Sequence, residues 1–246
     1  MEHKLNYMAE IKISDKTEKE RNLLYIQNHL KCLSGHLGFS CEISNSGDRT
    51  LLTVNCPDYY ADVVAIEIND KLSEIIAINY KYDFFKKRVK ICGLRDVEYE
   101  ILMASIISAD LDDDKKYVFN KIKDEKNIYM DGFFNFRLKN LKNKWEEIVS
   151  YIPHYFINSQ LKDFISYLLE SKKKKVYIDN GKVFDNNYKR LKRCELLDGD
   201  CVNIVREVIL SNCGQVELNG ELPKEDEVYL KEYYGDKIIF SQRYFV

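Results

Sequence analysis

Ile101-Leu102-Met103-Ala104-Ser105-Ile106-Ile107-Ser108-Ala109 is the stretch that decides the fold. It lies in a helix expected over about residues 95–109 and is apolar on most sides. A helix that is apolar all round is buried in the interior of a protein. The run is about half as long as the roughly 18–20 apolar residues that a membrane-spanning helix needs. The sequence therefore predicts a central core helix and no membrane span.

On the N-terminal side of this helix, the periodicity predicts a small sheet with two helices. Side chains alternate between apolar and polar over residues 5–13, as in a half-buried strand. Apolar residues then recur every three or four positions up to Leu37, as along one face of a helix. The expected elements are a strand over 5–13, a helix over about 17–37, a hairpin over 39–54 and a helix from Pro57 to about residue 76.

On the C-terminal side, helices come first and a second small sheet follows. A long helix begins near Phe134, and Pro153 should break or kink it because proline lacks an N–H group. Asn180-Gly181 is the strongest short signal for a hairpin turn, and Asp200 can cap a helix that reaches Leu210. The expected elements are helices over 113–126, 134–152, 157–168, 200–210 and 224–234, and strands over 175–179, 182–185, 215–218 and 237–240.

These patterns predict an α+β fold that is mostly helical, with small β-sheets near the N- and C-terminal ends. Apolar residues make up 45% of the 246 residues and charged residues 32%, a balance typical of globular proteins. We expect an N-terminal α+β unit over 1–93, a helical middle over 94–171 and a C-terminal α/β unit over 172–246. These three parts could pack as one compact domain.

The net charge and the cysteines limit which partners and which cellular compartment are expected. The 38 basic and 40 acidic side chains give a net charge of −2, so no global field attracts nucleic acid or anionic lipid. The seven cysteines are scattered and include no Cys-x-x-Cys pair, which indicates buried free thiols in a reducing compartment. The N-terminal residues contain no apolar signal-peptide core. We therefore expect a cytoplasmic protein.

One candidate metal site lies on the first predicted helix. His29, Cys32 and His36 share one helical face, and imidazole and thiolate are natural zinc ligands. Cys41 or Cys56, from the adjoining hairpin, could supply a fourth ligand. The alternative is that the three side chains only flank the apolar stripe of the helix as packing. No cofactor is otherwise indicated.

A basic region surrounds the Asn180-Gly181 hairpin and is a candidate for binding nucleic acid or another polyanion. Tyr177, Phe184 and Tyr188 stand between its charges, and such rings can stack on bases while basic groups bind the backbone. The alternative is a solvated helix end followed by an exposed loop. The basic residues are Lys172, Lys173, Lys174, Lys175, Lys189, Arg190, Lys192 and Arg193.

Asp110, Asp112 and Asp114 have the spacing that opens a calcium loop. Lys115 and Lys121, however, replace the glycine and the final glutamate that such a loop requires. We therefore expect the three carboxylates to favour the dipole of the helix that follows.

The stretch Asp131-Gly132-Phe133-Phe134-Asn135-Phe136-Arg137-Leu138-Lys139, followed by Trp145-Glu146-Glu147-Ile148-Val149, resembles the signature of the YtxC-like sporulation proteins of endospore-forming Firmicutes. Weaker matches continue to residue 185 and recur at Tyr233–Ile238. The chain departs from the family in lacking a cysteine-rich C-terminal end. The motif residues are Gly132, Phe133, Phe136, Arg137, Leu138 and Lys139. The resemblance implies a process, sporulation, and no particular reaction.

Arg137 is a charged residue in an apolar part of this motif, so we expect it to pair with a carboxylate. Glu146, Glu147 and Asp131 are the candidates. The alternative is that Arg137 binds an anion.

Sequence patterns point to no catalytic centre. The phosphate loop, the dinucleotide-binding glycine motif, the nucleophile elbow and the zincin motif are all missing from the sequence. We therefore expect a non-enzymatic interaction or regulatory protein of sporulation with one or more protein partners. One alternative is a nucleic-acid-binding protein that uses the basic hairpin region. Another is an enzyme whose site assembles only in space, which a pocket with converging polar groups would favour.

Overall fold

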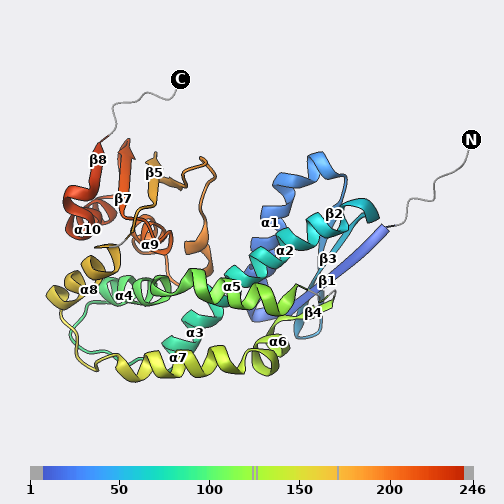
Figure 1. Ribbon diagram of the computed structural model, residues 1–246, viewed down its shortest axis with the longest axis horizontal. Helices are drawn as coiled ribbons and strands as arrows, with labels where there is room; N and C mark the ends of the chain where they lie inside the picture. Colours follow the sequence, from blue (N-terminus) through green and yellow to red (C-terminus); the bar gives the residue numbers. More distant parts are fainter. Residues whose placement is uncertain (1–7, 124, 126, 171, 241–246) are drawn as a thin grey trace, which may run out of the picture. The chain divides into compact units, whose positions relative to one another are not determined.

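The computed structural model describes residues 8–123, 125, 127–170 and 172–240, apart from the side chains of residues 34–37. The fold is α+β and 58% helical, with two four-stranded mixed sheets, which confirms the predicted class (Figure 1). No helix in these residues is long and apolar enough to cross a membrane.

The chain forms two compact units built from interleaved segments. Unit 1 comprises residues 1–77 and 113–145, and unit 2 comprises residues 78–112 and 146–246. This division differs from the three consecutive segments expected from the sequence. The chain changes unit inside three helical segments and not in loops, so no shift in composition marks the borders.

Unit 1 contains a sheet with the strand order β2-β3-β1-β4. The strands are β1 (Met8–Lys16), β2 (Ser40–Ser46), β3 (Arg49–Pro57) and β4 (Asn127–Tyr129). β1 pairs antiparallel with β3 and parallel with β4, and Ile13 is opposite both Leu52 and Ile128. All three side chains are buried.

Unit 1 contains the helices α1 (Glu20–Leu37), α2 (Ala61–Ile75) and α6 (Met130–Arg137). It also contains most of α5 (Leu111–Ile122) and the first part of α7 (Lys139–Tyr151). Short 3-10 turns at Thr17–Lys19 and Asp58–Tyr60 precede α1 and α2. α1 packs on α2 and on the first three strands. Its predicted apolar stripe is confirmed, because Leu23, Ile26 and Leu30 are fully buried.

Unit 2 contains a sheet with the order β6-β5-β7-β8. The strands are β5 (Lys175–Asp179), β6 (Lys182–Phe184), β7 (Gln215–Asn219) and β8 (Ile238–Phe240). The predicted hairpin is confirmed: Asn180 and Gly181 both have positive φ, at 46° and 73°, as its tight turn requires. The other two pairings in this sheet are parallel.

The helices of unit 2 pack on one another. They are α3 (Lys81–Lys86), α4 (Asp96–Ala109), α8 (Asn158–Glu170), α9 (Asn203–Leu210) and α10 (Lys224–Tyr234), with a π-helical turn at Ile76–Tyr80 and 3-10 turns at Arg193–Leu196 and Gly235–Lys237. α4 contacts α3, α8 and α9. Every residue from Ile101 to Ser108 is buried, which confirms the central helix predicted from the sequence.

Two helix boundaries differ from the prediction. The helix expected over 134–152 is divided at Leu138, whose side chain is fully buried and whose backbone leaves the helical region at φ −108° and ψ 32°. Asp200 does not cap α9, which begins at Asn203. Instead, Asp226 accepts hydrogen bonds from the N–H groups of Ile204 and Val205, each at 3.0 Å. The cap comes from α10, so local sequence could not show it.

Candidate functional site

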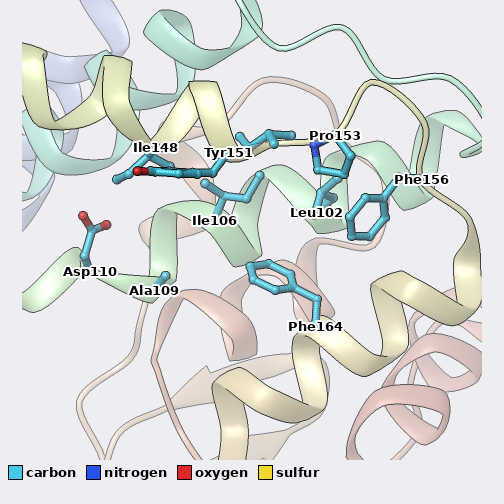
Figure 2. A pocket seen from close by; sticks show the side chains of 10 residues that line it. Leu102, Ile106, Ala109, Asp110, Ile148, Tyr151, Pro153, Phe156 and Phe164 are labelled. Carbon is cyan, nitrogen blue, oxygen red and sulfur yellow. The ribbon is translucent and has the colours of Figure 1, made fainter.

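A cavity suited to an apolar ligand lies against one face of α4, within unit 2. Its volume is about 400 Å³, within the range of small-molecule sites. Its walls come from α4, the end of α7, the loop after α7 and α8 (Figure 2). The lining residues are Leu102, Ile106, Ala109, Asp110, Ile148, Tyr151, Ile152, Pro153, Phe156 and Phe164.

α4 contributes to the cavity through its helical repeat. Leu102, Ile106, Ala109 and Asp110 recur at intervals of three and four residues, so they form one face of the helix. Phe164 of α8 and Phe156 of the loop present their rings to this face in Figure 2. The lining is therefore largely hydrocarbon, with one carboxylate from Asp110 and one hydroxyl group from Tyr151.

The loop that follows α7 is held in place by Cys92 and Gly93. Cys92 donates its N–H to the carbonyl of His154 at 2.9 Å and accepts the N–H of Phe156 at 3.0 Å. Gly93 has a φ of 98°, and a Cβ atom there would lie 2.5 Å from the carbonyl oxygen of Phe156. Only glycine fits this position, and the loop can therefore complete the cavity wall.

Asp110, at the end of α4, is the one carboxylate among the lining residues, and Tyr151 adds a phenolic hydroxyl. It forms an ion pair with Lys81 of α3, which also lies 5.6 Å from the ring centre of Phe85. The Lys81 side chain is completely buried, whereas 17% of the Asp110 side chain is exposed. Lys81 therefore does not reach the cavity, and one oxygen of the Asp110 carboxylate, Oδ2, is itself buried.

A second, smaller cavity of about 270 Å³ lies on the sheet of unit 2. Tyr177 and Tyr188 stack there, with ring centres 4.8 Å apart. Asp185 positions Tyr188 by accepting the N–H groups of Asn187 and Lys189, at 2.8 and 2.9 Å. The remaining wall carries carboxylates and an amide as well as apolar atoms: Ile178, Asp179, Phe184, Glu217 and Asn219.

The predicted basic residues precede or begin β5, or follow Tyr188 in the chain, and half of them form ion pairs or hydrogen bonds with other residues. Lys174 pairs with Asp112, Lys175 with Glu217, and Lys192 with Glu195. Arg193 donates to the carbonyl of Leu210 at 3.0 Å. Lys173, Lys189 and Arg190 are exposed, and Lys172 is half-buried.

Two of the three predicted metal ligands, His29 and Cys32, have described side chains. His29 Nε2 lies 2.7 Å from a carboxylate oxygen of Glu67, and Cys32 is exposed with its thiol directed to the carbonyl of Asn28. The side chain of His36 lies outside the described residues. No group of three or more metal-binding side chains is found among those that are described. Burial raises the pKa of the Cys41 thiol to about 11 and also raises that of Cys56.

The three aspartates that open the calcium-like spacing are engaged separately. Asp110 pairs with Lys81, Asp112 with Lys174, and Asp114 with Lys144. Their carboxylates therefore neutralise different lysines and do not surround a common point.

In the motif that resembles the sporulation family, some side chains are buried and others are exposed to solvent. Phe133 and Leu138 are buried, whereas Phe136 is 85% exposed and lines a shallow cavity of unit 1 with Arg137. The expected partners of Arg137 were wrong: its guanidinium lies 3.9 Å from Glu125, and Asp131 instead pairs with Arg49 at 2.6 Å. Gly132 lines the same cavity, and Lys139 is exposed at the start of α7.

Comparison with known proteins gives no relative: no family model, no curated protein and no solved structure matches the chain. The interpretation of the site therefore depends on its geometry alone.

The α4 cavity was not predicted from the sequence. Its apolar lining residues read as ordinary core positions, and Lys81 and Asp110 are 29 residues apart along the chain. One signal was available, because a lysine within the mainly apolar segment from Ile75 to Phe85 requires a buried partner.

Proposed function

We propose that this protein is a non-enzymatic regulatory protein that binds a small, largely apolar molecule in the α4 cavity. The observation that carries the proposal is the cavity itself, whose volume of about 400 Å³ and hydrocarbon walls suit such a ligand. Catalysis would require polar groups that converge on a reacting atom. The described lining residues offer one carboxylate, which is paired with Lys81, and one phenolic hydroxyl, that of Tyr151.

The cellular setting that we propose is endospore formation, in the cytoplasm and with a protein partner. The resemblance of Asp131–Lys139 to the YtxC-like proteins supports the process. The free state of all seven cysteines is compatible with a reducing compartment. Counting heat-resistant spores from a strain that lacks the gene tests the process, and an unchanged count would contradict it.

Ligand binding is tested with N-phenyl-1-naphthylamine, a neutral dye whose fluorescence rises in apolar surroundings. The variant Ala109→Trp places a bulky ring at a cavity-lining position that is exposed at the end of α4. Val228→Trp adds the same ring to α10, where the side chain is 54% exposed, and serves as the control.

We expect the dye to bind the unmodified protein and the control equally, and to bind Ala109→Trp at least about tenfold more weakly, because the ring occupies the space that the dye needs. Equal binding by all three proteins would show that the dye binds outside the α4 cavity. Absence of binding to the folded, unmodified protein would contradict the proposed function.

A second candidate function is the binding of single-stranded nucleic acid on the sheet of unit 2. The stacked Tyr177 and Tyr188 beside the exposed Lys189 and Arg190 favour it, since rings and basic groups together bind bases and phosphates. Changing Lys189 and Arg190 to glutamine should then weaken binding to oligonucleotides and reduce its dependence on salt. If the unmodified protein binds no oligonucleotide at low salt, this candidate fails.

A further inference from the structure

We infer that the second cavity, on the sheet of unit 2, binds a guanine base that stacks on tyrosine rings and donates its N–H groups to Asp179. This cavity shares no lining residue with the α4 cavity, so the inference goes beyond the apolar ligand proposed for α4. A guanine can belong to a free nucleotide or to a single strand, and only the strand would realise the second candidate function.

Side chains from one face of the sheet line the cavity. Val176 in β5 and Val216 in β7 are buried, whereas Tyr177 and Asp179 occupy alternate positions of β5 and are partly exposed. The strand register pairs Asp179 with Asn219 of β7. Aromatic rings and hydrogen-bonding groups therefore lie side by side on the face that is not buried.

The volume of the cavity suits one base. A water molecule occupies about 30 Å³ in the liquid, so a cavity of about 270 Å³ has room for on the order of nine water-sized groups. Covalently bonded atoms lie closer together than neighbouring water molecules, so a single purine fits this space. A base pair exceeds it, which restricts the site to an unpaired base.

The rings of Tyr177 and Tyr188 provide a stacking surface, and a tight loop fixes the second ring. Tyr188 has a φ of 56°, a conformation that is uncommon for a bulky residue. Asp185 holds the loop, because its carbonyl accepts the N–H of Tyr188 and its carboxylate accepts those of Asn187 and Lys189. Tyr188 is 52% exposed, so a base can lie against its ring.

Asp179 supplies the hydrogen-bond acceptor that a ligand would meet. Its Oδ1 atom accepts the amide N–H groups of Asn219 at 2.8 Å and of Asn180 at 3.3 Å. Within the part of the chain that the structure describes, Oδ2 has no hydrogen-bond partner and Asp179 forms no ion pair. The other lining carboxylate, that of Glu217, pairs with Lys175. An ionised carboxylate only accepts hydrogen bonds, so the ligand has to donate them.

Guanine matches this acceptor because its N1–H and its N2 amino group are adjacent donors. Adenine and cytosine carry an amino group beside a bare ring nitrogen, whose lone pair would face the carboxylate. Uracil has one N–H between two carbonyl oxygens, which the carboxylate also repels. The hydroxyl groups of Tyr177 and Tyr188 can donate or accept, so Asp179 decides which base binds.

Positive charges lie next to the cavity and suit the phosphate of a nucleotide. Lys189 follows Tyr188 in the chain, and Arg190 forms a β-bridge with Phe184, another lining residue. Lys189 and Arg190 are both exposed. The carboxylates of the lining repel a phosphate, whereas these two basic groups attract it. A nucleotide would therefore place its base in the cavity and its phosphate outside.

Five mononucleotides test the selection on the unmodified protein by isothermal titration calorimetry at low salt. They are the 5′-monophosphates of guanosine, inosine, adenosine, cytidine and uridine, and inosine is guanosine without the N2 amino group. We expect the guanosine nucleotide to bind at least about tenfold more tightly than those of adenosine, cytidine and uridine, the factor that a hydrogen bond to a charged group provides. The inosine nucleotide should lie between them, because it keeps one of the two donors.

Two RNA dodecamers, one of uridine alone and one with a single central guanosine, identify the source of the base. Tighter binding of the guanosine-containing strand than of the free guanosine nucleotide would identify a strand as the ligand. Binding of the free nucleotide without either dodecamer would uphold the inference and overturn the second candidate function.

Two substitutions assign the roles of the carboxylate and the ring. Asp179→Asn keeps the size of the side chain and turns one acceptor into a donor, so the preference for guanosine over adenosine should fall to about one. Asp163→Asn, the same change at an exposed position of α8, is the control and should leave the preference unchanged. Tyr188→Asn removes the ring with a residue that tolerates positive φ, and it should weaken all five nucleotides by at least about fivefold.

The outcomes separate the two proposals for this sheet. Equal affinity for the guanosine and adenosine nucleotides, or a preference for guanosine that Asp179→Asn retains, would overturn the inference and leave strand binding open to its own test. Absence of binding of all five nucleotides and both dodecamers to the folded protein would overturn both. Should Asp179→Asn fail to fold, the comparison of the five nucleotides on the unmodified protein still decides the question.

Discussion

The indole N–H of Trp145 donates a hydrogen bond to Asp114, with 2.8 Å between Nε1 and Oδ2. Both side chains are buried, and Lys144 donates to the other carboxylate oxygen at 2.7 Å. Asp114 therefore connects the start of α5 to the middle of α7 inside unit 1. A buried indole and a buried carboxylate each require such a partner, because neither can reach water.

Replacing Asp114 with alanine should destabilise unit 1 by about 1–3 kcal/mol, the cost of leaving a buried donor without an acceptor. Asp113→Ala is the control, since Asp113 is an exposed neighbour on the same helix and should cost less than about 1 kcal/mol. Urea unfolding followed by the fluorescence of Trp145, the single tryptophan of the chain, measures both. Equal midpoints for the two variants would contradict the role of Asp114.

The sequence predicted the elements whose own residues carry their signal. Ile101–Ala109 is apolar on most sides, so the burial of α4 followed from composition alone. The turn at Asn180-Gly181 requires positive φ at both residues, a conformation that asparagine and glycine adopt more readily than other residues. By contrast, β4 has only three residues, too few for an alternating pattern to be recognised. Its pairing with β1 brings together Ile13 and Ile128, which are far apart in the sequence. Such a pairing depends on the whole fold.

The candidate site could not be predicted from the sequence for the same reason. Its walls come from segments that are adjacent only after folding, and in the sequence its apolar wall residues resemble those of any core helix. Asp110 was expected to favour the dipole of the helix that follows it, and its pairing with Lys81 could not be inferred from spacing. Predictions from local pattern favoured clusters such as His29, Cys32 and His36, because those residues are close in sequence.

Asp131 provides a prediction about pH. Its carboxylate accepts hydrogen bonds from Arg49, and these hold its pKa below the ordinary value of 3.8. A carboxyl group whose pKa is lowered by folding stabilises the fold above its unfolded pKa and loses that contribution as pH falls through its folded pKa. Asp131→Asn should therefore cost about 1 kcal/mol near pH 7. The difference from the unmodified protein should shrink once the pH falls below about 4.

Urea unfolding of both proteins at several pH values between 7 and 2.5 measures this difference. Glu42→Gln, an exposed position on β2, is the control and should show only a small effect at any pH. A difference between Asp131→Asn and the unmodified protein that stayed constant down to the lowest pH would show that the Arg49 pair does not depend on the charge of Asp131.

Gly93 and Gly47 form a matched pair for testing the loop beside the cavity. Both have positive φ, but only at Gly93 would a Cβ atom collide with backbone, at 2.5 Å from the carbonyl oxygen of Phe156. Gly47→Ala should therefore cost only the conformational strain, about 1 kcal/mol. Gly93→Ala should cost at least twice as much, and it should weaken dye binding because the loop must move. Thermal unfolding measures the stability difference, and equal melting temperatures would contradict the steric argument.

The cysteines differ in exposure, and this difference corrects the expectation that all seven are buried. Cys32 and Cys92 are exposed, whereas Cys56, Cys194 and Cys213 are buried. Burial raises the pKa of Cys194 to about 12 and also raises the pKa of Cys213 and of Cys201, which is half-buried. The thiolate is the form that reacts with alkylating reagents. At pH 8, a thiol with a pKa of about 12 is ionised in about one molecule in 10⁴.

Brief treatment of the folded protein with iodoacetamide at pH 8 should therefore modify Cys32 and Cys92 first, as measured by mass spectrometry of the peptides. Treatment in urea should modify all seven positions, because unfolding restores both access and the ordinary pKa. Substituting Cys32→Ser should remove one fast site and leave the labelling of Cys92 unchanged, since the two thiols lie in different units. Rapid labelling of Cys194 or Cys213 in the folded protein would mean that α9 and its neighbours open on the timescale of the reaction, and the buried environment assigned to them would then be wrong.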